Sequence, residues 1–171
     1  MCLPTTGAGG SIARVPVVNG DDDLLTRLLA EEEELQFDAF TNETAWELGH
    51  ALVEAARRDG LSVTVDIRRG EQQLFHYALP GTAADNDAWI ERKNRVVRRF
   101  GHSSFAMRAA EGDAFAENYL LDPTQFAAHG GAFPLLVSGV GPVGTVVVSG
   151  LPQVEDHRMV VAALREHLRR K

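Results

Sequence analysis

The sequence predicts an α/β protein of the layered α+β kind, in which helices cover an antiparallel sheet. Two segments, residues 61–79 and 132–150, hold alternating or continuous apolar runs on both sides of a turn signal, which is typical of β-hairpins. Segments with apolar residues at helical spacing lie before, between and after these hairpins. Hairpins separated by helices favour an antiparallel sheet over a parallel one.

The first two helices are predicted before the first hairpin. Residues 21–37 carry a leucine stripe, and the acidic run at residues 31–34 is expected to be a solvated face of that helix. A second helix is expected to begin near Thr44, which has the spacing of a capping box to Glu47, and to end at Gly60.

A basic helix is predicted after the first hairpin. The hairpin of residues 61–79 turns at the sequence RRGE, and a loop follows it. Asp85 or Asn86 is the expected N-cap of the basic helix, and Gly101 is the expected residue just past its end.

The second half is predicted to end in a hairpin and a helix. An apolar or irregular stretch runs to Tyr119, and a short helix follows with Asp122 as N-cap and Pro123 in its first turn. In the second hairpin the strand GTVVVSG is expected to be central, and Pro142 is expected at a strand end or an edge. Residues 151–171 form the last predicted helix.

Composition narrows the class of protein. The chain has 171 residues, enough for one domain with its own core, and is predicted to be a leader at residues 1–20 followed by a single domain at residues 21–171. Its net charge of −7 argues against general nucleic-acid binding. The one cysteine, Cys2, excludes an intramolecular disulfide.

The same features favour a cytoplasmic protein. No apolar run approaches the roughly 18 residues of a membrane span, so no membrane partner is expected. The first 20 residues lack the charged and apolar regions of a signal peptide and are expected to be a flexible leader.

The basic helix carries the strongest hint of function. Five cationic side chains lie within the sequence WIERKNRVVRRFGHSS, residues 89–104. On a helical wheel, Lys93 falls inside the apolar face while Arg92 and Arg99 lie along one flank. A lysine in that position needs a partner. The sequence leaves three readings open: an ion pair with a residue such as Asp66, a pocket for an anionic ligand, or a subunit contact.

Other polar residues extend the candidate site. His102 and Ser103 follow the basic helix, where Ser103 or Ser104 can cap a new helix. His129 stands in the sequence HGG, which is read as a helix C-terminus. A serine hydrolase is not expected, because the chain has no nucleophile elbow of the form G-x-S-x-G.

The last helix adds one acidic residue and one histidine. Asp156 and His157 lie in its first turns, and His157 shares a face with apolar residues. With His102 and His129 it could ligate a metal, but no H-x-x-x-H or H-x-H pair occurs, so no metal site is assigned. His76 has the same ambiguity between a core group and a ligand.

Three stretches taken in order resemble a known family. They are LQFDAF, VDIRRGEQQLFHYALPGTAADNDAWIERKNRVVRRFGHSS and YLLDPTQFAAHGGAFPLLVSGVGPVGTVVVSGLPQVEDHRMVVAAL. They resemble an uncharacterised protein family of bacteria and fungi that is allied to the haem-degrading-domain proteins. The allied members include an extracellular haem-binding sensor component and glycolate-operon-associated proteins. The resemblance runs from about residue 21 to the C-terminus.

The resemblance implies a profilin-like antiparallel sheet flanked by helices on both sides, and homo-oligomers built from dimers. For the allied branch it implies haem or iron binding, so haem is the cofactor that the resemblance suggests, although no position here matches an axial ligand. It also marks seven residues of the shared motifs as candidate ligand-binding residues: Lys93, Arg99, His102, Ser103, His129, Asp156 and His157. The position of Arg92 beside Lys93 on the basic helix adds it to this set.

Three functions remain open at this level. The first is an oligomeric cytoplasmic protein that binds a small anionic molecule, haem or another carboxylate, near the basic helix. The second is a haem-degrading or metal-assisted enzyme that uses His102, His129 or His157. The third is a structural or adaptor protein, with the basic helix as a subunit contact and no small-molecule ligand.

Overall fold

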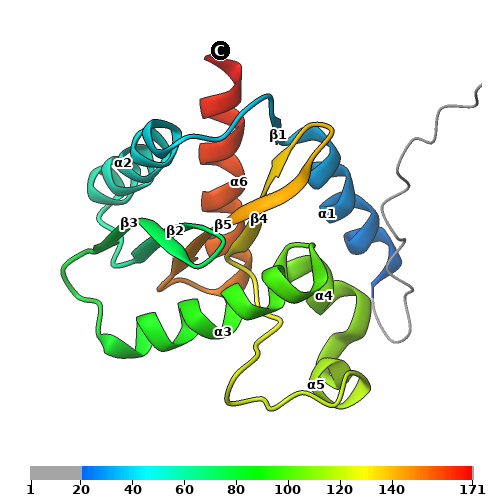
Figure 1. The fold of residues 1–171 in the computed structure, drawn as a ribbon. Coiled ribbons are helices and arrows are strands. Elements are labelled where there is room, and N and C mark those ends of the chain that lie inside the picture. The colour runs from blue at the N-terminus through cyan, green and yellow to red at the C-terminus, as the bar shows by residue number, and fades with distance from the viewer. Residues whose placement is uncertain (1–20, 171) are drawn as a thin grey trace, which may run out of the picture.

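A five-stranded sheet with helices on both faces forms the centre of the molecule (Figure 1). This computed structural model describes residues 21–170, so the predicted leader lies outside the described residues. The helices are α1 (Asp22–Glu34), α2 (Asn42–Asp59), α3 (Ala84–Phe100), α4 (Ser104–Glu111), the 3-10 turn η1 (Gly112–Ala114), α5 (Phe115–Asn118) and α6 (Gln153–Arg169). The strands are β1 (Gln36–Phe37), β2 (Thr64–Arg69), β3 (Gln72–Ala78), β4 (Ala132–Val137) and β5 (Gly141–Ser149).

The sheet has the order β1-β4-β5-β2-β3. Both predicted hairpins form, and β5 lies between β4 and β2, which confirms the prediction that GTVVVSG is central. Pro142 pairs with Leu136 at an irregularity near the start of β5, in agreement with the prediction of a strand end. The prediction of an antiparallel sheet is right for the four strands of the two hairpins, β2, β3, β4 and β5. The two-residue β1, which was not predicted, pairs in parallel with β4.

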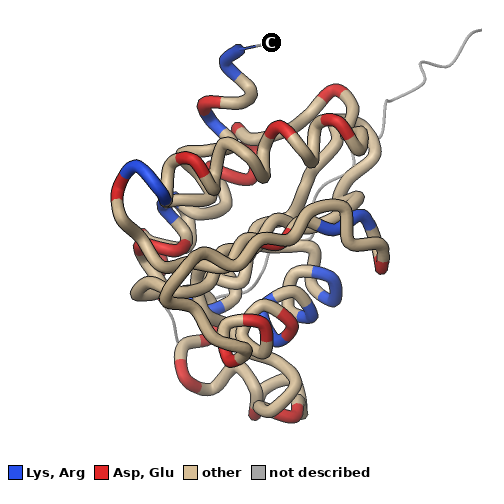
Figure 2. Tube along the Cα trace, turned by 90° about the vertical axis from the view of Figure 1, so that its left-hand side faces the viewer, with Lys and Arg blue, Asp and Glu red and all other residues tan. Residues whose placement is uncertain are grey.

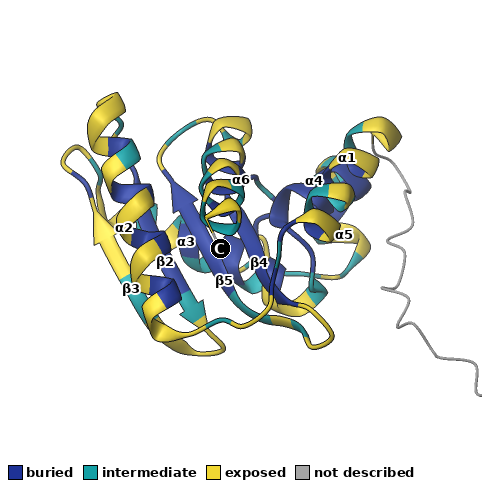
Figure 3. Ribbon diagram, turned by 90° about the horizontal axis from the view of Figure 1, so that it is seen from above, coloured by how far each residue is buried: buried dark blue, intermediate teal, exposed yellow. Residues whose placement is uncertain are grey.

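Two layers of helices bury the two faces of the sheet. On one face α2 and α6 cover Val63, Val65 and Ile67, which belong to the largest apolar cluster. On the other face α3 packs Ile90 and Val97 against the sheet. Successive residues of a strand point to opposite faces, so Asp66, between Val65 and Ile67, faces the α3 layer. Figure 3 shows the buried central strands and, at one side, the exposed β3.

Residues 101–131 differ most from the expectation. The stretch predicted as apolar or irregular contains α4, which packs on α1 through a second apolar cluster. The short helix predicted after Asp122 does not form. Asp122 instead accepts hydrogen bonds from the backbone N–H and the hydroxyl of Thr124, which closes a local turn. Short Asp side chains compete in this way with helix formation.

Two helix starts also differ from the predictions. Helix α2 is capped by Thr41, which forms a reciprocal pair with Thr44, so the capping box lies three residues before the predicted one. Helix α3 begins after Ala83, and the Asn86 side chain accepts a hydrogen bond from the Ala83 N–H instead of serving as N-cap. The predicted glycines at the helix ends, Gly60 and Gly101, both adopt left-handed conformations.

Candidate functional site

A small pocket opens between the first turns of α3, the loop before β4 and the start of α6. Its volume is about 310 Å³. The lining residues are Asp85, Asn86, Trp89, Lys93, His129, Gly130, Ser149, Gly150, Leu151, Gln153 and Asp156. Three of the predicted site residues, Lys93, His129 and Asp156, therefore meet at one place although 63 positions separate the first from the last.

Lys93 is buried at the floor of this pocket, with 2% of its surface exposed. Its ammonium donates to the Val148 carbonyl (2.6 Å), the Gly130 carbonyl (3.1 Å) and Asp156 Oδ2 (3.2 Å). An ammonium has three N–H donors, so these acceptors use all of them. The ion-pair reading of Lys93 is thus right about the kind of partner and wrong about its identity. The partner is Asp156, and Asp66 binds other groups.

Burial governs the protonation of this pair. Removal from water lowers the pKa of Lys93, and the attraction of Asp156 opposes that effect. Burial likewise raises the pKa of Asp156 against the attraction of Lys93 and a hydrogen bond from the Leu151 N–H at 3.0 Å. The pair joins α3 to the N-terminal turn of α6 and to the end of β5.

The two glycines of the HGG sequence make this arrangement possible. Gly131 has a φ of +118°, and a Cβ there would lie 2.6 Å from Lys93 Nζ and 2.9 Å from Asp156 Cβ. A Cβ on Gly130 would overlap the backbone of Gln153 at the start of α6. The HGG sequence therefore lets the chain pass close to Lys93 and α6. This is a different role from the helix C-terminus that was predicted.

His129 forms one wall of the pocket. Its ring stands edge-on to Trp89 with centroids 5.2 Å apart, and the Arg92 guanidinium lies 3.9 Å from the Trp89 ring centroid. Burial is the main cause that lowers the pKa of His129 from 6.5, followed by the positive charges of Arg108, Lys93 and Arg92. No described residue makes a hydrogen bond to its ring nitrogens. At neutral pH the pocket therefore presents a neutral imidazole.

The other predicted histidines bind to α1. His102 Nδ1 lies 2.7 Å from Glu32, and His157 Nε2 lies 2.8 Å from Glu31. Both histidines are buried. Within residues 21–170 no three His, Cys, Asp or Glu side chains are placed to hold a metal ion. The structure therefore does not bring His102, His129 and His157 together.

The acidic run of α1 is a solvated face only in part, because Glu33 and Glu34 are exposed while Glu31 and Glu32 bind buried histidines. Glu32 is 3% exposed and also accepts a hydrogen bond from the Ser103 N–H at 2.7 Å. Glu34 forms two 2.7 Å hydrogen bonds with Arg165. The charge pattern gave no indication of these contacts, because their partners lie far away in the sequence.

Ser103 and Arg99 have roles outside the pocket. The Ser103 hydroxyl caps α4 by accepting a hydrogen bond from the Ala106 N–H at 3.1 Å, as one of the two predicted capping options requires. The Arg99 guanidinium lies 5.6 Å and 5.7 Å from the ring centroids of Phe100 and Phe126. Figure 2 shows cationic residues gathered below the sheet, on the side of α3. Neither Arg92 nor Arg99 is among the residues that line the pocket.

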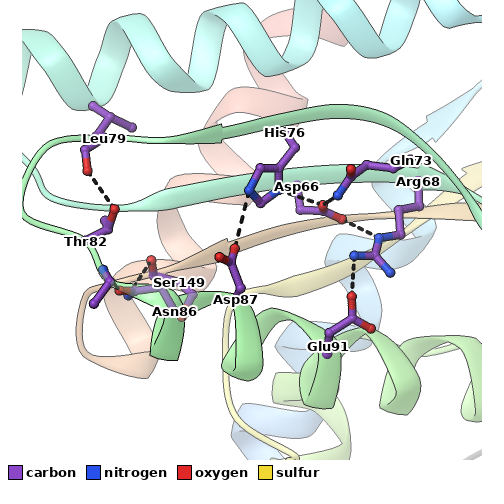
Figure 4. Close-up of polar contacts among 11 residues, drawn as sticks. Asp66, Arg68, Gln73, His76, Leu79, Thr82, Asn86, Asp87, Glu91 and Ser149 are labelled. Atoms are coloured by element: carbon purple, nitrogen blue, oxygen red, sulfur yellow. Dashed lines mark hydrogen bonds and ion pairs between the residues drawn. The ribbon is translucent and has the colours of Figure 1, made fainter.

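A second polar cluster, centred on Asp66, lies between the β2–β3 hairpin and α3 (Figure 4). The fully buried Asp66 carboxylate accepts hydrogen bonds from Arg68 (2.7 Å) and from Gln73, and pairs with His76 (3.0 Å). Arg68 continues to Glu91 of α3. This cluster was not predicted from the sequence. The hairpin pattern held the signal, because the strand register places Asp66 opposite His76.

A larger groove of about 1060 Å³ runs between α2 and α6 on the opposite layer. None of the predicted site residues lines it. The three arginines that line it pair with neighbouring acids, in Arg58–Asp59, Arg158–Glu155 and Arg170–Glu166. The smaller pocket is the stronger candidate for a ligand site. It combines the buried Lys93–Asp156 ion pair with the His129 imidazole, whose ring nitrogens have no hydrogen-bond partner among the described residues.

Comparison with known proteins identifies the family. Residues 40–165 match the family described as haem degrading protein HbpS-like. Among curated relatives, a UPF0303 protein of Streptomyces avermitilis is 56% identical over 149 residues, 85% of this chain and 91% of the relative. A UPF0303 protein of Edwardsiella ictaluri is 47% identical over 86% of this chain and 96% of its own length.

Solved structures agree with this result. The crystal structure of the Ybr137w protein superposes with a TM-score of 0.81 at 34% identity, covering 85% of this chain and 88% of that one. The crystal structure of HbpS has a TM-score of 0.60 at 23% identity, covering 78% and 92%, and shows the shared fold. The resemblance inferred from the sequence is thereby confirmed, and the chain belongs to the HbpS-like family.

Proposed function

We propose that this chain is a cytoplasmic binding protein whose pocket at His129 takes a small anionic ligand bearing a carboxylate. One observation carries the proposal. The half-buried imidazole of His129 has no hydrogen-bond partner among the described residues and lines a pocket of about 310 Å³. The same pocket is lined by the Lys93–Asp156 ion pair, whose ammonium already has three acceptors. Sites of this size with a few convergent polar groups are typical of small ligands. In the described part of the chain, no helix is long and apolar enough to cross a bilayer.

The pocket residues divide into support and contact groups. Lys93 and Asp156 support the floor, because the ammonium already has three acceptors. Contact with the ligand falls to the imidazole of His129, the indole of Trp89 and the amide of Gln153, whose oxygen accepts a 3.4 Å hydrogen bond from the Gly130 N–H. The N-terminus of α6 adds a partial positive charge that favours an anion.

Because His129 can take up a proton, the affinity for an anionic ligand is expected to depend on pH. The pKa of the free imidazole is lowered, and a bound carboxylate would favour the charged form. The affinity for a carboxylate is therefore expected to rise as the pH falls through the His129 pKa. A ligand held only by the α6 N-terminus would show no such dependence in that range.

Haem is the second candidate ligand, and His129 is the residue that favours it. A neutral imidazole is a ligand for haem iron, and the family description names haem. The pocket volume lies at the lower end of the range for drug-sized ligands. When bound, haem would supply redox chemistry, and His129 would hold its iron.

The test compares two histidine variants. His129→Phe keeps a ring against Trp89 and removes both nitrogens, while His50→Phe changes an exposed histidine of α2 outside the pocket. Acetate, citrate and haemin are titrated into each protein and followed by amide chemical shifts and by the Soret band. We expect shifts at Gly130 and Gly150 in the wild type and in His50→Phe, and none in His129→Phe.

The alternatives give distinct results in the same experiment. A Soret change with haemin alone, lost in His129→Phe, selects haem over small carboxylates. If His129→Phe and His50→Phe give identical titrations, His129 does not contribute to ligand binding, and the structural or adaptor hypothesis is favoured instead. In that case Arg92→Glu or Arg99→Glu is expected to dissociate an assembly without affecting any small molecule.

A further inference from the structure

One wall of the His129 pocket carries a hydroxyl group that the proposed function leaves unused. Ser149, the last residue of β5, lines the pocket and is 4% exposed. Its hydroxyl makes no hydrogen bond with any residue that the structure describes. Buried hydroxyls in folded proteins normally have a hydrogen-bond partner, so an unpaired one that faces a pocket is a contact point for a ligand.

A second unpaired hydroxyl lies beside the first. The register of the sheet places Thr64 of β2 directly opposite Ser149. Val147 packs on α3, and Val65 packs on the opposite layer. Since neighbouring residues of a strand alternate between the two faces, Thr64 and Ser149 both point toward α3. Thr64 is completely buried, and its Oγ1 has no hydrogen-bond partner in the described chain. Opposite residues have Cβ atoms about 4.5–5.5 Å apart, so a side-chain rotation brings the two hydroxyls into contact.

The surrounding backbone anchors Ser149. The Asn86 side chain of α3 donates a 3.2 Å hydrogen bond to the Ser149 carbonyl (Figure 4). Gly150 has a φ of +152°, and a Cβ there would lie 2.3 Å from the Ser62 carbonyl oxygen. The chain after Ser149 therefore passes close to the segment that leads into β2. These contacts hold the serine from two sides.

The charges next to Ser149 favour a neutral partner for its hydroxyl. The Lys93 ammonium binds the carbonyl of Val148, one residue before Ser149, at 2.6 Å. The Asp156 carboxylate accepts a 3.0 Å hydrogen bond from the N–H of Leu151, two residues after Ser149. Because these two charges compensate each other, a further buried charge would have no counter-ion, whereas a neutral group needs none. A ligand hydroxyl is neutral and both donates and accepts, as the serine hydroxyl does.

We propose that Ser149 binds a hydroxyl group of the ligand, which makes the ligand a small hydroxycarboxylate. Its carboxylate binds at His129, and its hydroxyl binds at Ser149. Thr64 is a positioning residue that donates to the Ser149 hydroxyl while Ser149 donates to the ligand. The inference rests on the proposed function, because it assigns a second group of the same ligand. A site built to bind a hydroxyl rejects the analogue that lacks it, since the buried serine then stays unpaired.

The test measures a preference between two kinds of ligand. Butyrate and its 2-, 3- and 4-hydroxy derivatives are titrated into the wild type and Ser149→Ala, and binding is followed by the amide shifts of Gly130 and Gly150. The control is Ser138→Ala, which changes an exposed serine of the β4–β5 turn outside the pocket. We expect one hydroxybutyrate to bind the wild type and the control at least about fivefold more tightly than butyrate. Ser149→Ala should bind butyrate as the wild type does and lose that preference.

The role of Thr64 is tested by the same ratio of affinities. Thr64→Val keeps the shape of the side chain without its hydroxyl and should reduce the preference while the affinity for butyrate stays unchanged. Thr64→Ser restores the hydroxyl and should keep the preference. A role in folding alone would change the affinity for both kinds of ligand alike, and that result overturns the positioning role.

Failure of this inference is distinguishable from failure of the proposed function. If no hydroxybutyrate binds more tightly than butyrate while His129→Phe abolishes the binding of both, the carboxylate site stands and the role of Ser149 is overturned. A preference that survives in Ser149→Ala overturns it as well. If no carboxylate binds, the proposed function fails and this inference fails with it. If Ser149→Ala does not fold, Ser149→Cys, which keeps the shape with a weaker donor, decides by the same ratio.

Discussion

Asp66 and Asp156 are both buried, and their surroundings differ. Asp66 is bound by side chains of its own hairpin, at most ten positions away. Asp156 is bound by Lys93, 63 positions away, at a point where β5, α6 and the HGG loop meet. The first cluster stabilises a local unit and attaches it to α3. The second joins segments that no local interaction would bring together, and it forms the floor of the pocket.

Removing one member of the long-range pair should have the largest effect. Lys93→Met leaves Asp156 buried without its cation and is expected to lower the free energy of unfolding by about 3–5 kcal/mol. Urea denaturation measures this difference. The double change Lys93→Met with Asp156→Leu should recover most of the loss, because it removes the buried charge as well. A double variant as unstable as the single one would contradict the ion-pair account.

Gly131→Ala should disturb the same ion pair by straining the backbone next to it. The residue has a φ of +118°, and its new methyl group would meet Lys93 and Asp156. The strain and the displaced ion pair are expected to cost about 2–3 kcal/mol. The control is Gly139→Ala, which also has a positive φ (+73°) but has open space around a Cβ. The difference in melting temperature between the two variants isolates the crowding at the pocket.

The local cluster should be less sensitive. Asp66→Asn removes the charge at its centre, but Arg68 keeps Glu91 as a partner and is partly open to water. The expected loss is about 1–3 kcal/mol of unfolding free energy. If Asp66→Asn destabilises the protein more than Lys93→Met does under the same conditions, the local cluster is not the less sensitive of the two sites.

The smallest effect concerns the pH dependence of His129. Because the folded-state pKa is lowered, the unfolded chain binds the proton more readily, and stability is expected to fall as the pH drops from 6.5 through the folded pKa. His129→Phe should lack this contribution. Proton NMR of the imidazole should show a pKa below 6.5, and Arg108→Gln should raise it by removing a nearby positive charge. An imidazole that titrates above 6.5 would contradict the burial argument.

The structure brings only some of the predicted site residues together. Lys93, His129 and Asp156 line one pocket, and Arg92 stacks on Trp89 of that pocket without lining it. Arg99, His102, Ser103 and His157 have their contacts elsewhere. Residue type and helical periodicity indicated that Lys93 points inward and needs a partner, because those properties are local. Asp66 also faces α3, so the choice of Asp156 over Asp66 depends on where α6 begins relative to Lys93, which is not a property of a single segment.

Local signals were enough to predict both hairpins, the glycine ends of α2 and α3, the inward position of Lys93 and the family. Which distant groups meet follows from the packing of the elements in three dimensions. That packing buries Glu32 against His102 and gathers His129, Lys93 and Asp156 into a pocket. Periodicity along the sequence shows which side of a helix or strand is apolar. The partners of buried polar groups are set by the packing of one element on another, and the distance between two residues along the chain does not show whether they meet.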